Sequence, residues 1–230
     1  MLRGGDRGYS LPEVLIASFV LVIVLLAIYI VYDTGLQDYA RGTARADVQQ
    51  NVRVALESMA RELRMAGYNP YTTSCTPAPP PPAGYLSSDI VGVTGTTLSS
   101  TSVPFWADVD GDNCPNQVTY TFVAPTNPTK PCDSSDPTTI GRITRSVQAW
   151  NGTAWSPTTP TAYDIAQCIT ALVLTYCDGS AATTCGGPGA PAATPKDVRR
   201  ITLSITGQEN IRGFGASTYT LVSDVRLRNP

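Results

Sequence analysis

The stretch Arg7-Gly8-Tyr9-Ser10-Leu11-Pro12-Glu13 decides the fold of this chain, because an uninterrupted apolar run, residues 14–31, follows it at once. The run has 18 residues and no charge, which gives about 27 Å of helix, enough to cross the hydrocarbon core of a bilayer. A secretory signal peptide would place small residues and a cleavage site after the run, and residues 28–32 offer none. The small residue, Gly8, lies in front of it instead. The sequence therefore predicts a membrane-spanning helix.

Charges and cysteines around this run predict its orientation. Arg3 and Arg7 precede the run and all six cysteines follow it, so the positive-inside rule places the N-terminus in the cytoplasm. Six cysteines beyond a membrane span indicate an oxidising compartment and disulfide bonds. Glu13 lies immediately before the run. Placing a carboxylate in hydrocarbon costs about 2.5 kcal/mol or more, so the Glu13 side chain needs a partner. We therefore expect Glu13 to be functional.

The pattern of Gly8, Tyr9 and Glu13 resembles the class III signal of type IV prepilins and type II secretion pseudopilins. The resemblance implies that a prepilin peptidase of the inner membrane cuts between Gly8 and Tyr9 and methylates the new amine of Tyr9. It also implies that Glu13 pairs with the Tyr9 amine, usually that of a neighbouring subunit, during filament assembly. Tyr9 replaces the commoner Phe, and Pro12 stands where an aliphatic residue is usual, although proline is tolerated in a first helical turn. The alternative is an uncleaved signal anchor.

Composition narrows the function of the rest of the chain. Its 230 residues suffice for one anchor helix and one globular domain, and the net charge of −2 gives no field that would attract nucleic acid. Histidine is absent, which removes the usual general base and the commonest metal ligand. No nucleophile elbow or phosphate-cradling glycine loop is found either. We therefore expect a protein that is not an enzyme and does not bind nucleic acid.

Beyond the apolar run the helical pattern continues as an amphipathic one up to Ala66. Arg53, Glu57 and Arg61 stand four residues apart on its polar side, the spacing of helical ion pairs. Gly67 and Pro70 then provide a cap and a stop, so one helix is expected from about Leu11 to Ala66. The expected organisation is a leader (1–8), a transmembrane helix (9–32), its amphipathic continuation (33–67) and a globular head (68–230).

The head is rich in strand and turn signals. A proline-rich linker or surface loop occupies residues 75–84, and Asn151-Gly152 marks a hairpin turn between Trp150 and Trp155. In the next-to-last expected strand Ile201, Leu203 and Ile205 alternate with polar residues, so one face should be buried. The expected fold is α+β and pilin-like, a long N-terminal helix packed on an antiparallel, β-rich head with disulfides. Expected strands are Ile90–Val93, Val103–Ala107, Gln117–Val123, Ile140–Trp150, Ile169–Cys177, Arg199–Thr206 and Thr220–Arg228.

Residues 55–68, 165–176, 198–206 and 219–229 resemble minor pilins of the PilW type and the related J-type pseudopilins. The resemblance implies a minor subunit that is held in the inner membrane with its head in the periplasm. After processing it would join other minor and major pilins to initiate or cap a pilus at the cell surface. Two alternatives stay open: a J-type pseudopilin of a type II secretion system, and a membrane-anchored periplasmic binding or adhesion protein that needs no processing at Gly8.

Asp108, Asp110 and Asp112 place three carboxylates at alternate positions, as in the first half of an EF-hand loop. The second half fails, because Thr119 stands at position twelve in place of a bidentate glutamate. The sequence leaves two interpretations open, a calcium site and a solvated acidic turn. No other cofactor is expected.

The six cysteines permit fifteen pairings, and the sequence does not choose among them. Zinc is disfavoured, since no Cys-x-x-Cys pair and no histidine is present. We favour pairings that close short loops, which leaves the third bridge to tie the helix exit to the sheet. The expected bridges are Cys114–Cys132, Cys177–Cys185 and Cys75–Cys168.

Overall fold

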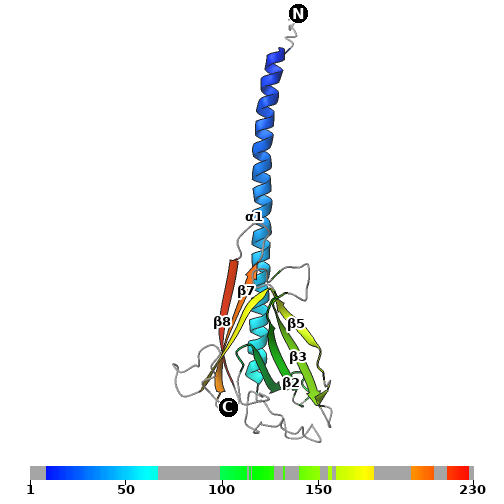
Figure 1. The fold of residues 1–230 in the computed structure, drawn as a ribbon, viewed down its shortest axis with the longest axis vertical. Helices are drawn as coiled ribbons and strands as arrows, with labels where there is room; N and C mark the ends of the chain where they lie inside the picture. The colour runs from blue at the N-terminus through cyan, green and yellow to red at the C-terminus, as the bar shows by residue number, and fades with distance from the viewer. Residues whose placement is uncertain are drawn as a thin grey trace, which may run out of the picture. The chain divides into compact units, whose positions relative to one another are not determined.

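The computed structural model combines one long N-terminal helix with two antiparallel β-sheets, so the fold is α+β, as predicted (Figure 1). It describes residues 9–66, 99–112, 114, 116–126, 132, 140–150, 155–156, 159–178, 198–209 and 217–227. The leader up to Gly8, the proline-rich run, the expected strand at residues 90–93, the Asn151-Gly152 turn, Cys75 and Cys185 all lie outside these residues.

The helix α1, Leu11–Met65, is 55 residues long and ends within one residue of the predicted position. At its end the backbone N–H of Ala66 donates to the carbonyl of Leu63 at 3.1 Å, which tightens the last turn. Arg53 and Glu57 form the predicted ion pair at 3.3 Å on the exposed side. The expected cap and stop, Gly67 and Pro70, lie outside the described residues.

The chain divides into two compact units, residues 1–44 and residues 45–230. In the first unit the helix is exposed almost throughout, including its large apolar side chains. In the second unit the helix turns one face into a core. The buried side chains on that face recur at steps of three and four residues, which is the amphipathic pattern expected from the sequence; they are Val48, Val52, Ala55, Met59, Ala60 and Leu63.

The head, residues 45–230, contains the two sheets. The first has the strand order β1-β2-β3-β4, and β5 also pairs with β3. The second has the order β6-β7-β8, and every strand pair in both sheets is antiparallel. The strands are β1 (Ser102–Ala107), β2 (Asn116–Val123), β3 (Arg142–Trp150), β4 (Trp155–Ser156), β5 (Ala162–Gln167), β6 (Ile169–Asp178), β7 (Val198–Glu209) and β8 (Ser217–Arg226).

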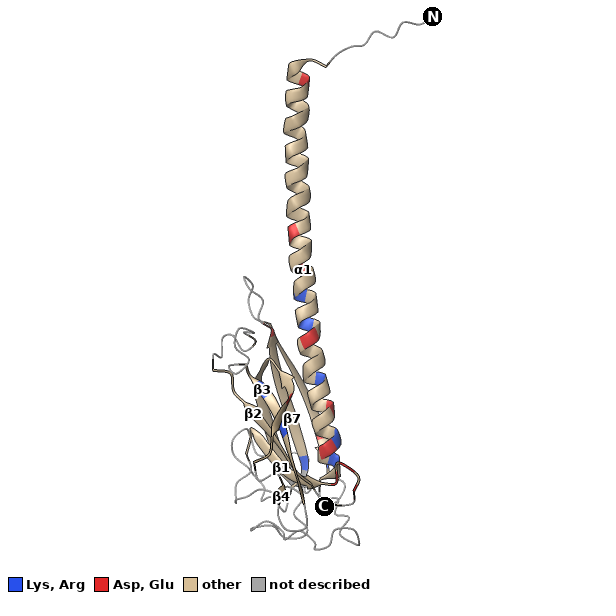
Figure 2. Ribbon diagram, turned by 90° about the vertical axis from the view of Figure 1, so that its right-hand side faces the viewer, with Lys and Arg blue, Asp and Glu red and all other residues tan. Residues whose placement is uncertain are grey.

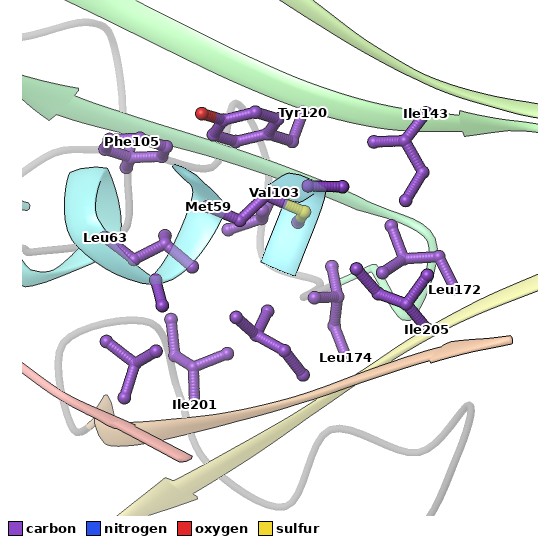
Figure 3. Packing of buried hydrophobic residues seen from close by; sticks show 14 of the residues in the cluster. Met59, Leu63, Val103, Phe105, Tyr120, Ile143, Leu172, Leu174, Ile201 and Ile205 are labelled. Carbon is purple, nitrogen blue, oxygen red and sulfur yellow. The ribbon is translucent and has the colours of Figure 1, made fainter. Parts of the chain in front are cut away.

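The head-domain part of α1 lies between the two sheets (Figure 3). Met59 and Leu63 are fully buried there, with Phe105 and Tyr120 of the first sheet on one side and Ile201 of the second sheet on the other. The Phe105 and Tyr120 rings stack with centroids 6.0 Å apart. The helix is therefore the shared core element of both sheets.

Six predicted strands are confirmed, with ends shifted by no more than three residues. Ile201, Leu203 and Ile205 are fully buried while their neighbours Thr202, Ser204 and Thr206 are partly exposed, as their alternation predicts. Strands β4 and β5 were not predicted. The sequence of β5 gives little signal, since most of its side chains are exposed.

Cys168 separates the two sheets. It has a φ of 64°, the left-handed conformation that non-glycine residues rarely adopt, and it stands between the last residue of β5 and the first of β6. Its carbonyl accepts the N–H of Gln208 at 3.0 Å. The backbone at Cys168 thus turns the chain out of one sheet and into the other.

The predicted bridges Cys114–Cys132 and Cys75–Cys168 are wrong, because Cys132 is bonded to Cys168 with 4.7 Å between the Cα atoms. The strand register explains this pairing. Val123 at the end of β2 lies opposite Arg142, and Arg142 lies opposite Gln167, so the chain leaving β2 starts beside Cys168. Cys114 precedes β2 and belongs to the opposite end of the sheet. Cys114 and Cys177 each take part in a disulfide bond as well. The predicted bridge Cys177–Cys185 stays a prediction, because Cys185 lies outside the described residues.

Candidate functional site

The first turn of α1 holds Glu13 by local hydrogen bonds. The Glu13 Oε2 atom accepts from the backbone N–H of Ser10 and from its hydroxyl, both at 3.4 Å. The Ser10 carbonyl accepts the N–H of Glu13 at 3.0 Å. Ser10 and Glu13 therefore act as N-cap and third helical residue, the spacing of a capping box. Pro12 lies between them in the first turn, where its missing N–H has no intrahelical acceptor.

The capping role of Glu13 is a structural function that the sequence analysis missed. The signal was present, since Ser10-Leu11-Pro12-Glu13 has the Ser-x-x-Glu spacing directly before an apolar run. Tyr9, the expected first residue of the mature chain, is 84% exposed, and Gly8 lies outside the described residues. The Ser10 N–H that reaches Glu13 belongs to the residue next to Tyr9.

The helix segment after Glu13 exposes a continuous apolar surface. Figure 2 shows its ribbon without a charged position until the next acidic residue, which is Asp33. The helix is long and apolar enough to cross a membrane, which fits a single-pass anchor. Exposed apolar area is unfavourable in water by about 25 cal/mol per Å², so this surface needs an apolar environment. Large side chains that are more than half exposed include Leu15, Ile16, Phe19, Leu21, Ile23, Leu26, Ile28 and Ile30.

The three aspartates between β1 and β2 form a compact turn. One carboxylate oxygen from each of Asp108, Asp110 and Asp112 lies within 4.8 Å of the others. Asp108 accepts the N–H of Gly111 at 2.7 Å, and Asp112 accepts the N–H of Cys114 at 2.7 Å. These bonds build the turn from within. Gly111 has a φ of 77°, a left-handed conformation that glycine adopts without strain.

Asn116 supports the same turn. Its amide nitrogen donates to Asp110 at 3.0 Å, and its amide oxygen accepts the N–H of Val109 at 3.0 Å. Burial raises the pKa of the Asp110 carboxyl, but the hydrogen bond from Asn116 and those of the turn outweigh it, so this pKa is lowered. Burial and the charges of Asp110 and Asp108 raise the pKa of the Asp112 carboxyl. The carboxylates of the turn lie close enough to repel one another, and each also accepts a hydrogen bond from the protein.

The aspartates fit a calcium ion only in part. Calcium takes six to eight oxygen ligands, and the cluster offers three carboxylates. Thr119, at the position of the bidentate glutamate in an EF-hand, is part of strand β2. The turn's own hydrogen bonds account for its acidic residues without a metal, which favours the solvated turn over a calcium site.

A second polar cluster fixes α1 within the head. The Glu62 Oε2 atom accepts from the hydroxyl of Tyr120 at 2.8 Å and from the Arg145 Nε at 3.0 Å. The side chains of Arg145 and Glu62 are 24% and 16% exposed, so their ion pair is shielded from solvent. Burial and the Glu62 carboxylate raise the pKa of Tyr120, which stays protonated as a donor. This cluster ties the helix to β2 and β3.

A short similarity links the chain to a known protein. The chain is 40% identical over 62 residues to the pilin-like protein PilA3 of Thermus thermophilus. The matched stretch is 26% of this chain and 26% of PilA3, so the chain matches about a quarter of that relative's length. This similarity supports a pilin-like protein. No family model matches the chain, and no solved structure matches it.

Proposed function

We propose that the chain is a type IV pilin-like subunit, and more specifically a minor pilin of the PilW type. A prepilin peptidase removes the leader between Gly8 and Tyr9 and methylates the Tyr9 amine. The processed subunit sits in the inner membrane with its head in the periplasm, and then joins other minor and major pilins in a pilus. Its role is structural rather than enzymatic.

The observation that carries this proposal is the continuity of α1. One helix begins at the Ser10–Glu13 cap, exposes an uncharged apolar surface, and ends as the shared core of a two-sheet head. An exposed apolar helix of this kind can lie in a bilayer and can then pack against the same helices of other subunits. The similarity to PilA3 supports the same class of protein.

The carboxylate of Glu13 is suited to bind the mature amine. The Ser10 backbone nitrogen already lies 3.4 Å from Glu13 Oε2, so the Tyr9 amine is generated one residue away from this acceptor. An ammonium and a carboxylate within an apolar environment attract strongly, and each offsets the cost of placing the other there. Glu13 therefore has two separable roles, capping by its oxygen atoms and pairing by its charge.

Two substitutions of Glu13 separate these roles. Glu13→Gln keeps an oxygen that can accept from Ser10 but removes the charge, whereas Glu13→Ala removes both. We expect both variants to insert into the membrane as wild type does and to be depleted from sheared filaments, in the ratio of filament-bound to membrane-bound protein. The exposed residue Glu57 provides the matched control Glu57→Gln, which should assemble normally. If Glu13→Gln enters filaments as wild type does, the carboxylate serves only as a cap and the proposed pairing is wrong.

A further inference from the structure

A cavity of about 590 Å³ in the head is lined mainly by basic side chains. Arg64 comes from the last turn of α1, Arg200 from β7 and Arg226 from β8, and Asp224 and Leu227 complete the lining. Figure 2 shows basic positions on α1 and on β7 at the same end of the head. This arginine cavity lies away from the acidic turn in sequence and belongs to none of the sites described above.

The strand register brings two of its positive charges together. Arg200 lies directly opposite Arg226 in the β7–β8 pair, an arrangement that destabilises a sheet when both residues are charged and unscreened. The Arg200 Nη2 atom donates to the Sγ atom of Cys177 at 3.7 Å, so this guanidinium lies against β6. Arg64 adds a third guanidinium. It lies in the last turn of α1, where its positive charge interacts favourably with the helix dipole.

Asp224 is the acidic member of the lining. Its Oδ1 atom accepts the hydroxyl of Thr202 at 2.6 Å, so part of its acceptor capacity is used within the sheet. With three arginines and one aspartate, the lining has a formal charge of +2. The lining therefore concentrates positive charge, and a bound anion would lower its electrostatic energy.

We propose that the arginine cavity is a binding site for a multivalent oxyanion, carried by carboxylate or phosphate groups. The planar fork of an arginine side chain matches two oxygens of either group, and several arginines can bind one polyvalent anion together. Leu227, which is 8% exposed, is the nonpolar member of the lining. This site does not depend on the pilin proposal, because it needs only the folded head.

The direct test is calorimetric titration of the full chain in a nonionic detergent with citrate and, separately, with inorganic phosphate. Chloride at equal ionic strength is the reference, since it screens charge but cannot bind two arginines in a planar fork. We expect saturable binding of one anion per chain, weakened as salt is added. Binding of citrate alone identifies a carboxylate site, binding of phosphate alone a phosphate site, and binding of both a general oxyanion site.

Two variants and one control make the test specific. Arg226→Gln should weaken anion binding about tenfold or more, the usual loss for a charge-assisted hydrogen bond. Arg64→Gln should also weaken binding. Arg61→Gln is the matched control, since Arg61 is exposed on the same helix but does not line the cavity.

Two results would overturn the proposal. The first is that neither citrate nor phosphate binds wild-type protein more than chloride does. The second is that Arg226→Gln lowers the melting temperature in chloride and leaves anion binding unchanged, which would make Arg226 a structural residue of the sheet.

Discussion

At the scale of single residues, Glu62 shows what a helical pattern cannot reveal. The sequence predicted Arg53, Glu57 and Arg61 on the polar side of the helix, and Arg53 and Glu57 are exposed there. Glu62 instead accepts from Tyr120 and Arg145, which are far away in sequence. Periodicity identifies the apolar face of a helix, but it gives no information about which polar residues at its border find partners on another element.

Gly207 is a second residue whose role depends on tertiary contacts. It lies in β7 opposite Tyr219, and a Cβ atom there would come within 2.7 Å of methyl groups of both Val48 and Val52. These valines are on α1, so the glycine allows the helix to approach the sheet closely. Their methyl groups are attached near the backbone, and relief of the contact requires a shift of the helix.

We therefore predict that Gly207→Ala lowers the free energy of unfolding by about 1–3 kcal/mol, the usual cost of overpacking a core. Denaturant unfolding of the full chain in detergent, followed by tryptophan fluorescence, measures this. The double variant Gly207→Ala/Val52→Ala should lose less stability than the sum of the two single losses, since the smaller residue at 52 makes room. Additive losses, or an alanine at 207 that stabilises the protein, would contradict the close packing.

At the scale of elements, the sequence predicted most of the helix and strand positions because alternation and helical periodicity are local. The helix and six strands follow from apolar residues that repeat every two or every three to four positions. The start of β6 at Ile169 was predicted correctly, but the left-handed conformation of Cys168 just before it was not. Strand β5 was missed because it buries few side chains and pairs with β3 through an irregular register.

In the acidic turn between β1 and β2, the carboxylates that could bind calcium are the same ones that hold the turn together. Asp108, Asp110 and Asp112 each accept a hydrogen bond from the turn or from Asn116. We predict that the melting temperature of the full chain in detergent is the same in chelator and in millimolar calcium. A rise that corresponds to about 2.7 kcal/mol at a hundredfold excess over Kd, and that Asp110→Ala removes, would instead establish a calcium site.

At the scale of the whole molecule, disulfide pairing was the least predictable feature. Short sequence separation favoured Cys114–Cys132, but the bridge that forms, Cys132–Cys168, spans 36 residues. It follows from strand order, since Val123, Arg142 and Gln167 lie side by side at one end of the first sheet. The arginine cavity was missed for the same reason, because its members come from three elements that only the folded head brings together.

The N-terminal segment was predictable as a candidate site because its residues are adjacent in sequence. Gly8, Tyr9 and Glu13 need no tertiary contact to be recognised together. The structure adds the cap by which Ser10 holds Glu13. Processing at Gly8 is the part of the proposal that separates a pilin-like subunit from an ordinary membrane-anchored binding protein, which keeps its leader.

The most direct test of this account is the mass of the N-terminal peptide of the protein extracted from membranes of cells with active prepilin peptidase. We predict a chain that begins at N-methylated Tyr9. Replacing Gly8 with valine should leave the leader attached while the protein still inserts in the membrane. A wild-type chain that begins at Met1, with no methylated Tyr9 peptide, would contradict the proposal that this protein is processed as a pilin.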